Sequence, residues 1–155
     1  MSEENIELAT RGMRLFAVII DALIIVPIMF LIAKTTGFWE QIMPRLASGL
    51  PLTMQELIIM FVVGQSLFLI LNGSLLAKHG QTIGKKIVGV KIVDTQQKSV
   101  GLLKLYFLRY LTFSFISQIP LIGSLINLIN ILFIFGKEKR CLHDRIAGTV
   151  VIKNK

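Results

Sequence analysis

The residue best placed to do chemistry is Asp21, a carboxylate inside the apolar run from Leu15 to Ala33. A run of about 19 apolar residues is long enough to cross a bilayer. A charge within it costs roughly 2.5 kcal/mol or more on insertion scales. Arg14 lies two helical turns earlier on the same helix face. An intramembrane carboxylate of this kind predicts either a buried ionic partner or a proton or cation site.

Three further apolar segments carry polar groups at the depth of Asp21. At 1.5 Å per residue, all four groups lie in the inner leaflet, some 10 Å from the cytoplasmic ends of their predicted helices. We call these four groups the polar layer. The amides Gln65 and Asn127 lie on the same helix faces as Asn72 and Asn130. Together these residues are Asp21, Gln65, Asn72, Arg109, Asn127 and Asn130.

Two interpretations of this layer stay open on the sequence alone. In the first, Asp21 and Arg109 form a buried ion pair, and the amides are interhelical hydrogen-bonding groups. In the second, Asp21 is a proton or cation site whose charge is exchanged during transport.

Two other polar motifs are weak matches to known binding sites. Gly80 to Lys86 resembles a phosphate-binding loop but lacks its spacing and the hydroxyl residue after the lysine. Cys141, His143 and Asp144 gather three possible ligands, but we favour a helix start in which Asp144 caps the turn or binds a basic neighbour. We therefore expect no metal, no cofactor and no enzymatic activity.

Charge and apolar length define the predicted elements. Membrane helices are expected at 14–34, 57–77, 102–118 and 121–136, with a short interfacial helix near Phe38 to Met43. The loop 78–101 and the tail 137–155 are rich in lysine and arginine, which places both on the cytoplasmic side. Four crossings then leave both termini cytoplasmic. Because the last two helices are short, a tilted or partly re-entrant hairpin is the alternative.

Two β-branched segments complete the predicted fold. Residues 87–93 and 149–152 read as short strands, and we expect them to pair because an unpaired strand exposes its backbone groups. The fold class is thus an all-α membrane protein with a short cytoplasmic β element, formed as one domain over residues 1–155.

The composition and the charge distribution indicate which binding partners to expect. The chain has 155 residues, 54% of them hydrophobic, and a net charge of +8. The lysines and arginines flank apolar segments, so we expect contact with the bilayer and its anionic lipid headgroups rather than with nucleic acid. The single cysteine, Cys141, excludes an intramolecular disulfide. The first helix is expected to be a retained anchor, and the small bundle to form a homo-oligomer.

Three motifs resemble those of the RDD family of small bacterial membrane proteins. They are residues 14–21, which fit Arg-x-x-Ala-x-x-Ile-Asp, residues 80–93, and residues 142–151, which begin Leu-His-Asp-Arg. The resemblance covers nearly the whole chain in the expected order. It implies that the family's named residues are Arg14, Asp21 and Asp144, with Arg109 at a position where members tend to carry an arginine.

The same resemblance implies a multi-pass protein of the bacterial inner membrane, and sodium/proton exchange has been suggested for some members. We expect a small cation/proton antiporter or permease that uses Asp21, with a monovalent cation or proton as its ligand. The alternative is a non-transporting scaffold or accessory subunit in which the charges are structural. Matched depth further predicts that Arg14 pairs with Asp144 at the membrane surface, while Asp21 faces Arg109 one layer deeper.

Overall fold

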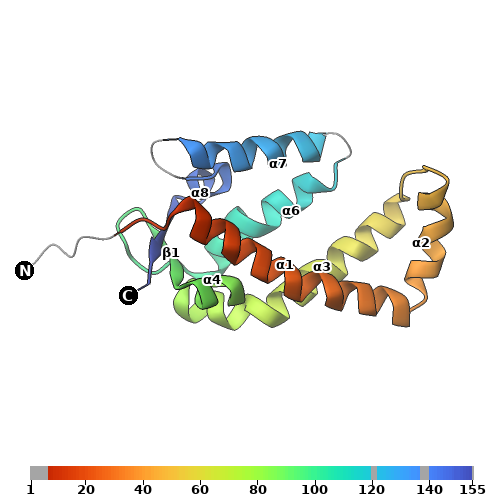
Figure 1. Cartoon of the computed structure of the whole chain (residues 1–155), viewed down its shortest axis with the longest axis horizontal. Coiled ribbons are helices and arrows are strands. Elements are labelled where there is room, and N and C mark those ends of the chain that lie inside the picture. The colour runs from red at the N-terminus through yellow and green to blue at the C-terminus, as the bar shows by residue number, and fades with distance from the viewer. Residues whose placement is uncertain (1–6, 120–121, 137–139, 155) are drawn as a thin grey trace, which may run out of the picture.

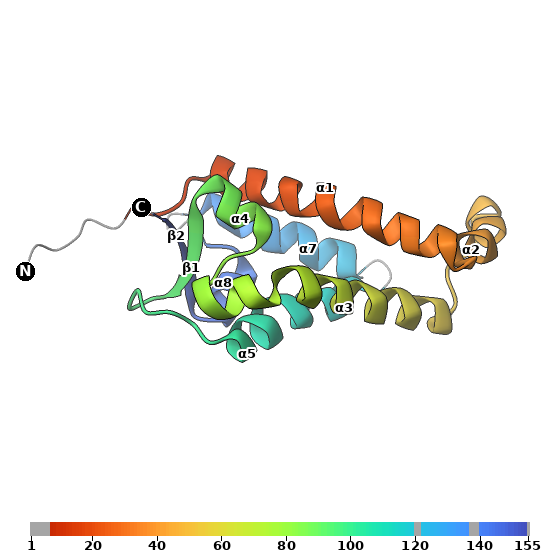
Figure 2. The same ribbon diagram turned by 90° about the horizontal axis from the view of Figure 1, so that it is seen from below.

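Two long helices and a small antiparallel sheet form the frame of the protein (Figure 1). The computed structural model describes residues 7–119, 122–136 and 140–154, apart from the side chains of residues 127, 131 and 134. Helix α1 (Arg11–Thr35) leads through α2 (Phe38–Ala47) into α3 (Met54–His79). Helices α1 and α3 run side by side in opposite directions, with α2 at one end and the sheet at the other (Figures 1 and 2).

Both long helices begin at hydroxyl caps. The Thr10 hydroxyl accepts a hydrogen bond from the backbone N–H of Met13 at 3.2 Å. Thr53 and Glu56 form a reciprocal capping box at the start of α3. With 25 and 26 residues, the helices are about 38 Å long, which exceeds a hydrocarbon core of about 30 Å.

Few apolar side chains of α1 and α3 are buried, and many of the large ones are exposed. A core helix of a soluble protein would bury them, whereas lipid solvates them. In the described part of the chain these are the two helices long and apolar enough to cross a membrane.

The remaining helical segments form a hairpin beside this pair. Its first arm runs through α5 (Leu102–Lys104), the π-helical segment η1 (Leu105–Leu111) and α6 (Thr112–Ser117). Its second arm is α7 (Ile122–Leu132) followed by the 3₁₀ turn η2 (Phe133–Phe135). The first arm is about 24 Å long, and α6 and α7 end short of the far ends of α1 and α3 (Figures 1 and 2).

The sheet joins the two ends of the chain. Strand β1 (Val90–Asp94) pairs antiparallel with β2 (Thr149–Lys153), from Val90 opposite Lys153 to Asp94 opposite Thr149. The predicted pairing of the two β-branched segments is therefore confirmed. The N-terminal segment joins the other side of β2, where the Ala9 N–H donates to the Val151 carbonyl at 3.0 Å.

Two short helices flank the sheet. The sequence predicted a helix start at Asp144 for one of them, and the other was interpreted as part of the loop. They are α4 (Ile83–Val88) and α8 (Leu142–Ile146). We call α4, β1, α8 and β2 the sheet unit. Its apolar core contains Leu76, Val90, Ile92, Leu105 and Val151. The expected strand at 87–93 begins only at Val90, because α4 extends to Val88 and ends at Gly89, which has a left-handed φ of 75°. The Thr82 hydroxyl caps the start of α4 by accepting from the Lys85 N–H.

Helix α4 lies directly on α1 at Gly84. A Cβ there would overlap the carbonyl oxygen of Ala17 and lie 2.9 Å from Cγ of Asp21. Backbone cannot move away as a flexible side chain can, so only glycine fits this contact.

We therefore expect Gly84→Ala to undock α4 and to destabilise the protein by about 1–3 kcal/mol through overpacking. Gly73→Ala is the matched control, because a Cβ at Gly73 of α3 meets nothing within 4 Å. Thermal unfolding of both purified variants in detergent measures the difference. Equal melting temperatures would contradict the close α1–α4 contact.

Candidate functional site

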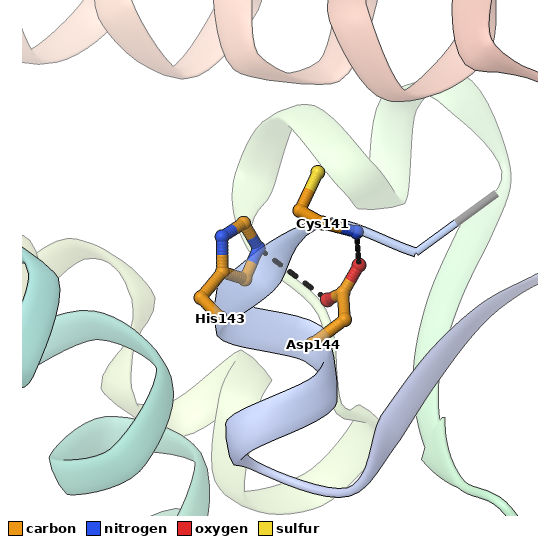
Figure 3. Close-up of side chains that lie close together, drawn as sticks. All are labelled: Cys141, His143 and Asp144. Carbon is orange, nitrogen blue, oxygen red and sulfur yellow. Dashed lines mark hydrogen bonds and ion pairs between the residues drawn. The ribbon is translucent and has the colours of Figure 1, made fainter. Parts of the chain in front are cut away.

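Asp144 is the centre of the largest charged cluster. It lies in the first turn of α8 and is fully buried. One carboxylate oxygen, Oδ2, accepts from the Cys141 N–H at 3.0 Å and from the Arg14 guanidinium. The other, Oδ1, forms an ion pair with Arg109. Figure 3 shows the carboxylate directed at the Cys141 nitrogen and at the His143 ring.

The two arginines bring distant segments to this carboxylate. Arg14 belongs to α1, so its pairing with Asp144 agrees with the pairing that matched depth suggested. Arg109 belongs to η1, and it also donates to the Thr149 hydroxyl of β2 at 2.7 Å. A single buried carboxylate thus holds α1, η1, α8 and β2 together.

The π-helical turn is what carries Arg109. Directly after η1, the hydroxyl of Thr112 in α6 donates to the Phe107 carbonyl, five residues earlier, at 2.7 Å. Such wide turns are frequently found at functional sites. Here the turn contains Arg109, whose buried guanidinium contacts the sheet unit.

Electrostatics keep Asp144 ionised. Burial by itself raises the pKa of its carboxyl group, but the neighbouring positive charges, Arg109 above all, outweigh burial and lower the pKa to about 2. The same surroundings also lower the pKa of His143, which keeps that group neutral rather than charged. Burial, followed by the charges of Arg109 and Arg14, lowers the pKa of the His143 imidazole to about 3, so the ring is neutral at pH 7.

The His143 ring lies between two acceptor oxygens, and the neutral ring can donate its single N–H to one of them. Its Nε2 lies 3.3 Å from Oδ1 of Asp144, and its Nδ1 lies 2.9 Å from Oδ1 of Asn130. The Asn130 oxygen also accepts from the His143 backbone N–H at 3.0 Å. Asn130 therefore fixes the start of α8 against α7.

Cys141, His143 and Asp144 have ligand atoms within 4.8 Å of one another, which is close enough to hold a metal ion. The chemistry of the cluster opposes a cation. Both oxygens of Asp144 already bind guanidinium groups, and the Cys141 sulfur points away from the carboxylate (Figure 3). Burial raises the pKa of the Cys141 thiol, which disfavours the thiolate that metals require.

The predicted Asp21–Arg109 ion pair is wrong. Asp21 instead binds the N-terminus of α4, where its Oδ2 accepts from the Thr82 hydroxyl at 2.6 Å and its Oδ1 from the Gly84 N–H at 2.7 Å. A helix N-terminus offers free N–H groups and a partial positive charge, so it attracts a carboxylate. Arg109 is drawn to Asp144, because two buried cations need that one anion.

The predicted polar layer divides into separate contacts. Asn72 joins Asp21 at α4, since its side-chain oxygen accepts from the Ile83 N–H at 2.9 Å. Asn130 belongs to the Asp144 cluster. Gln65 accepts from the Tyr106 hydroxyl at 3.1 Å, between α3 and η1. The side chain of Asn127 lies outside the described residues.

Sequence reasoning missed Thr82, Lys85, His143 and Thr149 as parts of these contacts. Thr82 carried a usable signal, since a threonine before a short apolar and basic segment is a common helix cap. Lys85 carried none. It is buried, with 8% of its surface exposed, and its ammonium lies 3.4 Å from the Thr82 hydroxyl.

The fold and the charged clusters define a helical membrane protein with a sheet unit tied to its long helices by buried ions. The family model for the RDD family matches residues 8–148. The chain belongs to the RDD family.

Two curated relatives support this assignment. The uncharacterized protein YckC of Bacillus subtilis is 33% identical over 132 residues, which cover 77% of this chain and 85% of that protein. The uncharacterized protein RP437 of Rickettsia prowazekii is 40% identical over 79 residues, which cover 48% of this chain and 38% of that protein. No solved structure matches the chain.

Neutralising Asp144 should cost most of the protein's stability. Asp144→Asn leaves Arg14 and Arg109 buried without their anion, and breaking a buried pair in this way costs about 3–5 kcal/mol. Glu40→Gln is the control, because Glu40 and Lys34 form an ion pair with both partners largely exposed. Thermal unfolding should show a large loss for the first variant and little change for the second. Equal losses would refute the central role of Asp144.

The two shifted pKa values predict a stepwise loss of stability in acid. Unfolded His143 takes up a proton below about pH 6.5, and folded His143 only near pH 3, so stability declines as the pH falls from 6.5. The Asp144 contribution is complete above its ordinary pKa of 3.8 and is lost as the pH falls towards 2. His143→Gln should flatten the melting temperature between pH 6.5 and 4.5. An unchanged slope in that variant would assign the loss to other groups.

Proposed function

We propose that this RDD-family protein is a small permease of the bacterial inner membrane, in which Asp21 exchanges a proton or a monovalent cation. The observation that carries the proposal is the set of partners around Asp21. Its oxygens bind a hydroxyl and a backbone N–H, and no ion pair joins it to a cation among the described residues. A carboxylate without a fixed counter-ion can bind and release a cation.

The contrast with Asp144 supports the division of roles. Asp144 is fully buried between two guanidinium groups, which suits a permanent structural charge. Asp21 is only partly buried, which suits a group that must be reached by its ligand. The alternative of a non-transporting scaffold is favoured by one fact, namely that both Asp21 oxygens also hold α4.

A hydrogen-bonded chain leads from Lys85 to Asp21. The Lys85 ammonium donates to the Thr82 hydroxyl at 3.4 Å, and that hydroxyl donates to Asp21 Oδ2 at 2.6 Å. In the proposed step, a proton or cation that binds Asp21 displaces its contacts with the Thr82 hydroxyl and the Gly84 N–H. Loss of these contacts loosens α4 from α1, and Lys85 acts by orienting the Thr82 hydroxyl.

The proposed topology places the sheet unit and both ends of the chain on the cytoplasmic side. Helices α1 and α3 cross the membrane, and the α6–α7 hairpin enters from the cytoplasmic face and returns to it. This arrangement keeps the lysines and arginines of residues 78–101 and 140–153 inside. It also agrees with the arms of the hairpin, whose first arm is only about 24 Å long. The lipid-exposed faces of α1 and α3 offer area for a homo-oligomer.

Exchange in proteoliposomes tests the proposal. Wild-type protein should move protons against a sodium, potassium or lithium gradient, and Asp21→Asn should reduce that exchange by at least tenfold. The amide can still accept from Gly84, so the variant should stay folded. Lys85→Gln should slow exchange while leaving Asp21 itself in place.

Thermal unfolding of each variant is the control for folding. A folded Asp21→Asn variant that exchanges at the wild-type rate would remove Asp21 from the mechanism. An absence of exchange by the wild type with all three cations would favour the scaffold.

A further inference from the structure

A polar cavity of about 230 Å³ lies where α3 meets β1. The end of α3 contributes Lys78 and His79, and β1 contributes Lys91. Neutral polar side chains also line it, among them Gln97, Ser99 and Asn154. Among the described residues, no aspartate or glutamate lines the cavity. The cavity is independent of both charged clusters described above.

The basic groups at this cavity lack anionic partners. Within the part of the chain that the structure describes, Lys78, His79 and Lys91 form no ion pair. The neighbouring acid, Asp94, uses its Oδ1 to accept from the N–H groups of Gln96 and Lys98 in the adjoining turn. Lys78 is exposed and Lys91 half-buried, so both can be reached by an anion from solution, and an anion in the cavity is attracted by both charges.

Capping of α3 does not account for these side chains. The Gly80 N–H donates to the Leu76 carbonyl at 3.1 Å and the Gln81 N–H to the Leu75 carbonyl at 3.4 Å, so backbone groups close the end of the helix. Gly80 has a left-handed φ of 63°, and a Cβ there would overlap the Ile92 carbonyl oxygen. The tight turn brings the last residues of α3 alongside β1 (Figure 2).

The backbone on the far side of the cavity is strained. Gln97 has a φ of 67°, in the left-handed region, and it is the non-glycine residue with a positive φ among the described residues. Such a conformation is unfavourable for a residue with a side chain. Strained residues cluster at ligand sites, and Gln97 is also part of the cavity wall.

We propose that this cavity binds a phosphate group, through Lys78 and Lys91 with hydrogen bonds from the surrounding amide and hydroxyl groups. The volume suits a phosphate with a small substituent rather than a larger ligand. The cavity lies at the end of α3, and in the topology proposed above this end of the helix is at the headgroup level. The phosphodiester of an anionic phospholipid is therefore the expected source, since basic pockets at this level bind such headgroups. Free inorganic phosphate is the other source of the same chemistry.

Binding to the purified full-length chain in detergent tests this proposal without any measurement of transport. Phosphatidylglycerol, phosphatidylcholine and inorganic phosphate are each titrated against the wild type. The double variant Lys78→Gln/Lys91→Gln removes the two cavity lysines. The double variant Lys86→Gln/Lys98→Gln is the matched control, because it removes the same charge at exposed positions outside the cavity.

Phosphatidylglycerol should raise the melting temperature of the wild type and of the control, and phosphatidylcholine should not. Its affinity for the cavity variant should fall by roughly tenfold or more. Stabilisation by inorganic phosphate, lost in the cavity variant alone, would also support the site and would identify the free anion as its ligand. Equal weakening in both double variants, or no stabilisation of the wild type by either phosphate source, would overturn the proposal.

Discussion

The protein depends on the cost of burying charge. Arg14, Arg109 and Asp144 are each nearly or fully withdrawn from solvent, and none of the three could remain there alone. The carboxylate is stable as an anion because two guanidinium groups surround it, and the guanidinium groups are tolerated because the carboxylate is there. The three residues come from α1, η1 and α8. The same ion pairs therefore stabilise the sheet unit and hold it against α1.

Asp21 and Asp144 are both carboxylates, but their surroundings differ. Asp144 meets permanent cations and is locked, whereas Asp21 meets the neutral donors of a helix N-terminus. The difference arises from α4, whose glycine lets it approach α1 closely enough for a backbone N–H to reach the carboxylate. If the charge of Asp21 changes, its hydrogen bonds to the start of α4 change too, so α4 is the element that would move.

Much of the frame followed from the sequence, because apolar length and β-branched runs are local signals. The long helices and the strand pair were predicted from such runs, and Arg14 with Asp144 from matched depth and opposite charge. Depth along a helix does not say which neighbour a side chain faces, so Asp21 was assigned to the wrong partner. The α4 segment was interpreted as a loop because six residues carry too little periodicity to reveal a helix. The roles of Thr82 and Gly84 depend on contact with α1, which the local sequence does not reveal.

The sheet also links the start of the chain to its end, through Ala9 on β2 and Arg14 on Asp144. On the ribosome these partners are separated in time. Asp144 is made 130 residues after Arg14, which at typical elongation rates is an interval on the order of 10 s. During that interval Arg14 can keep its guanidinium at the headgroup level by snorkelling. The contacts of Arg14 with Asp144 and of Ala9 with β2 therefore form only after the last strand has been made.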